Sequence, residues 1–139
     1  MSFDNVILAL HVMGAMMWIG GLFATVAFLE VTIPEPDAGA RTRLLKATRA
    51  AAIVPDVGLT MAIVFGAHWL MRFKLYEAHF MWAKLSAVGV IVGIHVYLRM
   101  KVGKLKRGEA VTAPPPVMKP MISLLALGTL IFVLTKWPT

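Results

Sequence analysis

Four long apolar runs constrain this chain more than any other feature. They cover roughly residues 6–28, 50–70, 80–98 and 120–134. Each is close to the roughly 20 residues that an α-helix needs to cross a bilayer core. The 139 residues are 59% hydrophobic, which exceeds the usual apolar share of a soluble domain. The sequence therefore predicts an all-α membrane protein with one domain, residues 1–139, folded as a four-transmembrane-helix bundle.

Basic residues are concentrated in two of the three connections, whereas the second connection has only Arg72 and Lys74. The positive-inside rule places such connections in the cytoplasm. Both termini are then expected on the outer side, and the first run is read as a retained helix in a bacterial inner (cytoplasmic) membrane. The net charge of +7 reports topology, and no nucleic acid partner is expected. The two basic sets are Arg41, Arg43, Lys46 and Arg49, and Arg99, Lys101, Lys104, Lys106, Arg107 and Lys119.

The chain contains no cysteine. This excludes disulfides, cysteine-ligated iron–sulfur clusters and covalent c-type haem attachment. Any metal would have to be bound by His, Met, Lys or carboxylate side chains.

The helical rise places the polar residues of the runs in two layers. His11 and Lys84 each lie about one turn from the outer side, so they can meet, whereas Asp56 and His95 belong to the inner half. Lys84 and His95 are eleven residues apart, so they share a helix face about 16 Å apart along the axis. One haem iron cannot use both.

Each of these residues has a functional and a structural interpretation. A lysine inside a membrane run is usually kept for a function or a partner, but Lys84 can also extend its stem to the interface. His11 can converge with Lys84 and with Trp18, seven residues later on the same face, or can simply form a hydrogen bond across helices. His95 can ligate a second cofactor, pair with Asp56 or bond a backbone carbonyl, and the structural options are favoured.

Glycines and methionines crowd the first run. Gly14, Gly20 and Gly21 allow close approach of a neighbouring helix or a flat ligand. Thioethers favour Cu(I), which makes the cluster 13–17 a candidate copper site. Its methionines point in different directions around a helix, so packing is the preferred interpretation.

Three stretches resemble the HemJ-type protoporphyrinogen IX oxidases and, more distantly, the copper-resistance D membrane domain. The first is 11–23, HVMGAMMWIGGLF, with His11 followed by Trp18 at the family's spacing. The second is Trp82-Ala-Lys84 followed by His95. The third is RLLK at 43–46, leading towards Pro55 and VFG at 64–66.

The chain departs from the family pattern at the inner end of the bundle. Residues 24–27 read ATVA where the family usually has Pro-Arg, and residues 117–120 read VMKP where it has Asn-Glu before a proline.

The resemblance implies a b-type haem held in the bundle with His11 as the axial metal ligand. Trp18 and His95 would also contact the cofactor, and Lys84 would act as a catalytic residue, as a propionate partner or, deprotonated, as the second ligand. The implied reaction oxidises protoporphyrinogen IX to protoporphyrin IX and passes electrons to a membrane acceptor. The expected partners are therefore membrane lipid, porphyrin and that acceptor, with homo-oligomers and larger complexes left open.

Two other functions remain open from the sequence. The chain can be a non-catalytic haem-bearing or structural subunit of a larger respiratory or photosynthetic membrane complex. It can also be a copper-transport module that uses His11 and the methionines of the first run.

Overall fold

The computed structural model describes residues 2–136, and the regular structure in that range is entirely helical. Three helical units are long and apolar enough to cross a membrane: α1, the unit Ala38–Arg72 formed by α2 and α3, and α4; a shorter apolar stretch lies in α5. The elements are α1 (Phe3–Thr32), α2 (Ala38–Ala51), α3 (Ile53–Arg72), the 3₁₀ turn η1 (Leu75–Glu77), α4 (His79–Lys106) and α5 (Met118–Lys136).

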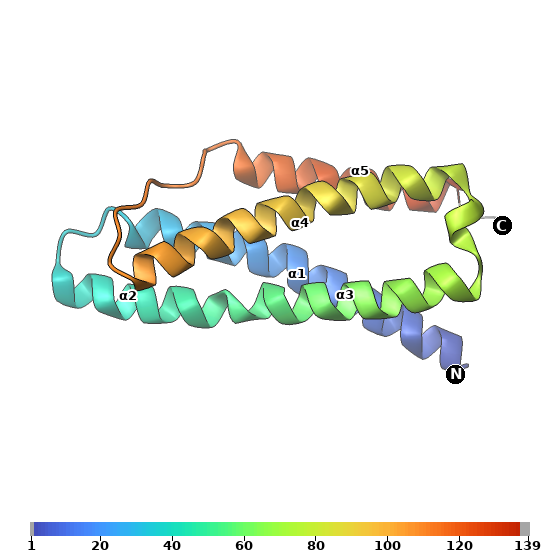
Figure 1. The fold of residues 1–139 in the computed structure, drawn as a ribbon, viewed down its shortest axis with the longest axis horizontal. Helices are drawn as coiled ribbons and strands as arrows, with labels where there is room; N and C mark the ends of the chain where they lie inside the picture. The colour runs from blue at the N-terminus through green and yellow to red at the C-terminus, as the bar shows by residue number, and fades with distance from the viewer. Residues whose placement is uncertain (1, 137–139) are drawn as a thin grey trace.

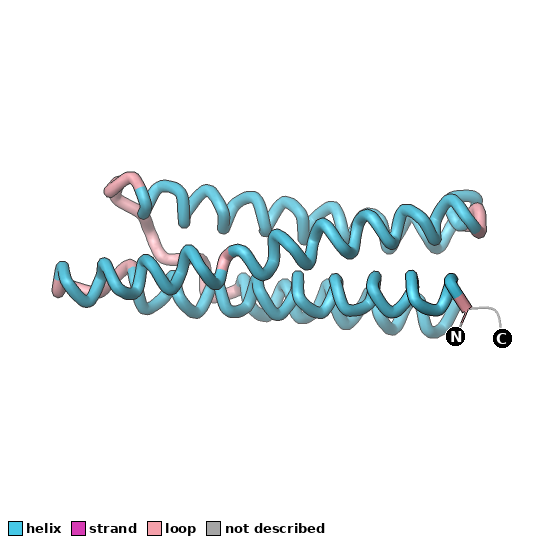
Figure 2. Tube along the Cα trace, turned by 90° about the horizontal axis from the view of Figure 1, so that it is seen from below, coloured by secondary structure: helices cyan, strands magenta, loops and turns pink. Residues whose placement is uncertain are grey.

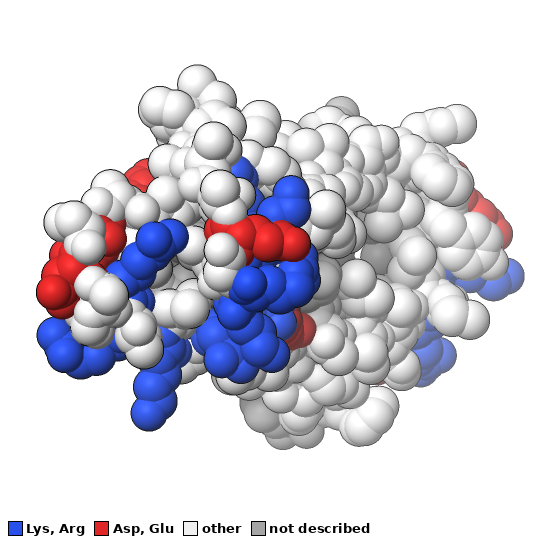
Figure 3. Space-filling view, turned by 60° about the vertical axis from the view of Figure 1, so that its left-hand side comes forward, with Lys and Arg blue, Asp and Glu red and all other residues white. Residues whose placement is uncertain are grey.

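The long helices run along one common direction, with α1 crossing behind α3 and α4 (Figure 1). A second view shows the same elongated bundle of helices (Figure 2). The first residues of α1, η1 and the end of α5 lie at one end, called here the terminal end (Figure 1). The α1–α2 and α4–α5 connections lie at the opposite end, called here the basic end, where Lys and Arg side chains gather (Figure 3).

All four predicted runs lie in helices, but the connection predicted at 29–49 is wrong in part because it contains α2. Asp37 begins this helix, since its carboxylate accepts a hydrogen bond from the backbone N–H of Ala40 at 2.7 Å. Apolar runs alone do not reveal such a helix, because α2 is rich in arginine and alanine and is helical without being hydrophobic.

A proline explains the break between α2 and α3. Pro55 has no N–H to donate to the carbonyl of Ala51, and its ring crowds that carbonyl. The chain therefore turns at Ala52 and continues as α3, so that the two helices form one long unit along the bundle (Figure 1).

Helices α1 and α3 pack with their backbones in near contact. A Cβ atom added at Gly58 would lie 2.3 Å from the backbone nitrogen of Trp18, and one added at Gly21 would lie 2.5 Å from Cδ of Pro55. Gly14 is equally confined, whereas a Cβ at Gly20 would meet nothing within 4 Å. Two of the three predicted glycines therefore permit the close approach, and the partner is a helix backbone.

Helix α1 also makes directional polar contacts. Within the described range, it has one side-chain hydrogen bond or ion pair to each of its four neighbouring helices. The core around these contacts is apolar and includes Leu22, Val26 and Leu98. The outer surface is also apolar, with Met16 and Leu124 about 70% exposed, as expected for a surface facing lipid. The four contacts are His11–Ala62, Trp18–His95, Thr32–Thr48 and Glu30–Lys119.

Candidate functional site

His11 is held against α3 by a hydrogen bond that fixes its orientation. Its Nδ1 lies 2.8 Å from the carbonyl oxygen of Ala62. A carbonyl can only accept, so Nδ1 carries the proton and donates it. One turn further along α3, Gly66 leaves room for the ring, because a Cβ there would lie 2.8 Å from Cε1 of His11. Within residues 2–136, Nε2 has no hydrogen-bond partner.

Lys84 is the second residue of the predicted outer layer. It comes from the first half of α4. It is half-buried, and no described residue forms an ion pair or hydrogen bond with its Nζ. The oriented imidazole and this uncompensated cation, which the sequence predicts at the same depth on two helices, are called here the His11–Lys84 pair.

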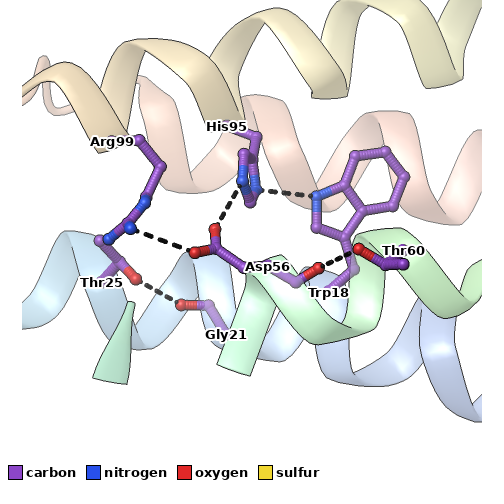
Figure 4. Close-up of polar contacts among 7 residues, drawn as sticks. All are labelled: Trp18, Gly21, Thr25, Asp56, Thr60, His95 and Arg99. Carbon is purple, nitrogen blue, oxygen red and sulfur yellow. Dashed lines mark hydrogen bonds and ion pairs between the residues drawn. The ribbon is translucent and has the colours of Figure 1, made fainter. Parts of the chain in front are cut away.

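A second cluster lies nearer the basic end and connects three helices (Figure 4). The indole N–H of Trp18 on α1 donates to Nδ1 of His95 on α4 at 3.2 Å. Nε2 of His95 lies 2.9 Å from Oδ1 of Asp56 on α3. The other carboxylate oxygen, Oδ2, lies 3.2 Å from Nη2 of Arg99. These four residues are called here the Trp18–Arg99 chain.

The order of donors determines the protonation of His95. An indole N–H can only donate, so Nδ1 must present its lone pair. The proton of the neutral ring is then on Nε2, where it is donated to the Asp56 carboxylate. Trp18 is 3% exposed and His95 is 6% exposed, so these bonds are shielded from water. Both nitrogens of His95 are therefore engaged.

Nearby hydroxyls are satisfied by their own helices. Thr25 donates to the carbonyl of Gly21 and Thr60 donates to the carbonyl of Asp56, each one turn back along the chain (Figure 4). The hydroxyl groups beside the Trp18–Arg99 chain thus already have partners. The partly exposed members of the Trp18–Arg99 chain are Asp56 and Arg99.

These positions give the outcome of the sequence predictions. Asp56 and His95 lie together, as their shared depth predicts, and the shared layer of His11 and Lys84 stays a prediction. The pairing of His95 with Asp56, one of three options, is the one observed. Trp18 shares the second layer, where it bonds His95. The cofactor roles of these residues stay predictions.

The role of Arg99 was not recognised from the sequence, where it counted only as a basic connection residue. Its signal is the spacing, because it follows His95 by four residues and therefore lies on the same helix face. That position brings it over Asp56.

His68 and the methionines of the first run take part in neither set of hydrogen bonds in the described part of the chain. His68 packs edge-on against Phe3 with ring centroids 6.0 Å apart. Met13, Met16 and Met17 line a shallow, open, apolar groove on α1. The part of the chain described by the structure contains no group of three His, Cys, Asp or Glu residues arranged to hold a metal ion. A single imidazole such as His11 is still a sufficient protein ligand for haem iron.

Comparison with known proteins adds no relative. No family model, no curated protein and no solved structure matches this chain.

Proposed function

We propose that this protein binds haem b through His11 and acts as a HemJ-like membrane oxidase that converts protoporphyrinogen IX to protoporphyrin IX. It spans a bacterial cytoplasmic membrane as four helices, with both termini outside and the basic end in the cytoplasm. The sequence resemblance suggests the reaction, and the arrangement of His11 supports the cofactor.

The orientation of His11 is the observation that carries this proposal. Histidines that bind metals commonly donate their second ring nitrogen to a backbone carbonyl, which fixes the tautomer and the direction of the ring. His11 does this through Nδ1 and the carbonyl of Ala62, leaving Nε2 for a ligand. Its neighbour Gly66 supplies the space that the ring needs.

The rest of the donor set fits a porphyrin as well. Lys84 has no carboxylate partner in the described part of the chain, so its ammonium is available for a propionate. The α1–α3 interface is closed by backbone contacts at Gly14 and Gly58, so a macrocycle has no room there. The group would therefore approach His11 from outside that interface.

The cofactor would supply electron-transfer chemistry at its iron. The protein's own residues would hold and orient it: His11 would bind the iron through Nε2, and Lys84 would supply the positive charge that binds a carboxylate of the cofactor or of the substrate. The Trp18–Arg99 chain lies about 10 Å deeper along α1, because Trp18 follows His11 by seven residues.

The test is a reduced-minus-oxidised visible spectrum of the purified wild-type protein and of two histidine variants. We expect a b-type haem signal in the wild type and in His79→Ala, and its loss in His11→Ala. His79 is the matched control because it begins α4 at the same end of the bundle and is exposed. Circular dichroism should show equal helix content in all three. Oxidation of protoporphyrinogen IX, followed by the fluorescence of the product, should be lost only in His11→Ala.

Two outcomes would overturn the proposal in different ways. Normal haem content in His11→Ala would remove the ligand assignment. A wild-type protein that stays haem-free after incubation with haem would remove the cofactor, and bound copper in that protein would point to copper transport instead.

A further inference from the structure

We infer that His95 is a positioning residue that fixes the register of α1 against α4 and thereby the approach of His11 to Lys84. It does so by accepting the indole N–H of Trp18 at its Nδ1. The value of this register for haem binding rests on the proposed function, whereas the register itself is a property of the protein alone.

The two interfaces of α1 differ in what sets their alignment. Against α3, the two helices approach so closely at Gly14, Gly21 and Gly58 that a Cβ atom at any of these positions would clash. Against α4, the described residues provide a single side-chain hydrogen bond, from Trp18 to His95. The surrounding apolar core adds close packing without directional bonds, so this hydrogen bond is the directional contact between α1 and α4.

The geometry carries the effect along the bundle. Helices α1 and α4 both run from the terminal end to the basic end (Figure 1). Trp18 follows His11 by two turns on α1, and His95 follows Lys84 by three turns on α4. Because helices transmit a displacement along their axes, a slip at Trp18–His95 moves His11 relative to Lys84 by a similar amount.

The Trp18–Arg99 chain cannot relay protons from one end to the other, which favours a positioning role over proton transport. Trp18 ends it with an N–H that only donates, so no proton can pass beyond Nδ1 of His95. At the other end both carboxylate oxygens of Asp56 are engaged, one by His95 and one by Arg99. A network of paired groups whose Trp18–His95 part is buried makes a packing arrangement specific.

The test measures the register by distances between spin labels. Because the natural chain has no cysteine, two introduced cysteines are the only labelling sites. The reporting pair is Val12→Cys with Ala83→Cys, on α1 and α4, and the reference pair is Val12→Cys with Val64→Cys, on α1 and α3. All three positions are exposed. Pulsed electron spin resonance is recorded on haem-free protein in lipid nanodiscs.

Three substitutions at His95 separate its two hydrogen bonds. His95→Asn places an amide oxygen near the position of Nδ1, so it keeps the bond from Trp18 and loses Asp56. His95→Gln places an amide nitrogen near the position of Nε2, so it keeps Asp56 and loses Trp18. His95→Ala loses both.

We expect a narrow α1–α4 distance distribution in the wild type and in His95→Asn, and loss of that narrow distribution in His95→Gln and His95→Ala. The α1–α3 distribution should stay narrow in all four proteins, which also shows that each variant is folded. An unchanged α1–α4 distribution in His95→Ala overturns the inference, as does a register held by Gln and lost with Asn.

Failure of this inference and failure of the proposed function are distinguishable. If the wild-type protein binds no haem but its α1–α4 register depends on His95, only the proposed function fails. If the wild-type protein binds haem but its α1–α4 register does not depend on His95, only the positioning role fails.

Discussion

The two polar clusters of this bundle differ in how completely their groups are paired. In the Trp18–Arg99 chain, both nitrogens of His95 and both oxygens of Asp56 have partners on neighbouring helices. In the His11–Lys84 pair, one imidazole nitrogen is fixed, and the other nitrogen and the ammonium have no partner in the described structure. Both clusters lie among helices that are apolar enough to cross a membrane.

The difference indicates a division of roles. An unpaired polar group in an apolar region has a free-energy cost that a ligand can remove, so the His11–Lys84 pair is suited to binding. A completed network gains nothing from a ligand and instead holds helices in place. Substitutions in the Trp18–Arg99 chain should therefore reduce stability, and substitutions in the His11–Lys84 pair should reduce binding.

The largest expected effect comes from Gly58→Ala, which acts on both clusters. The added Cβ would meet backbone atoms of Trp18, Gly14 and Met17, so α1 and α3 must separate. Overpacking of this kind costs about 1–3 kcal/mol of unfolding free energy. Detergent-induced unfolding followed by circular dichroism measures it. Gly20→Ala is the control, because its Cβ meets nothing within 4 Å. Equal stability of the two variants would contradict the close packing of α1 on α3.

A smaller loss is expected from Asp56→Ala, which breaks only the Trp18–Arg99 chain. The substitution leaves the Nε2–H of His95 and the guanidinium of Arg99 without their acceptor. Such a loss costs about 1–3 kcal/mol, and the partly exposed carboxylate puts it near the lower value. The same unfolding measurement checks it.

Asp56→Asn separates the two contributions. Its amide oxygen can still accept from His95, but it no longer offers a negative charge to Arg99. Its stability should lie between those of the wild type and Asp56→Ala. If Asp56→Ala is as stable as the wild type, the Trp18–Arg99 chain does not hold the helices together.

Several of these features could be predicted from the sequence, and the physical reasons for success and failure differ. Apolar runs locate the membrane-length helices because burial in lipid depends on composition. Helical rise places His11 and Lys84 in one layer and His95 and Asp56 in the other, since depth depends only on residue count. The basic helix α2 was missed because its stability depends on its Asp37 cap and helix propensity, and not on hydrophobicity.

Rotation of the helices was harder to predict than depth. The sequence places Trp18 on the same face as His11, but it does not say which neighbour each side chain contacts. That depends on how glycines seat α1 on α3, because this contact turns Trp18 towards His95. The pairing of Arg99 with Asp56 likewise depends on the position of α3 beside α4.

The smallest effect on stability is expected from Lys84→Met, which sharpens the contrast between the clusters. Methionine is similar in length to lysine but carries no charge. Replacing this unpaired cation in an apolar helix should therefore change the unfolding free energy by less than about 0.5 kcal/mol, or raise it. Haem content and porphyrinogen oxidation should nevertheless fall.

Lys84→Arg distinguishes two reasons for that fall, because arginine keeps the charge for a propionate and cannot replace a neutral lysine as an iron ligand. Binding retained in the arginine variant assigns Lys84 to a propionate, and binding lost in both assigns it to the iron. A methionine variant with full haem content and full activity would leave Lys84 as a side chain that merely extends to the membrane surface.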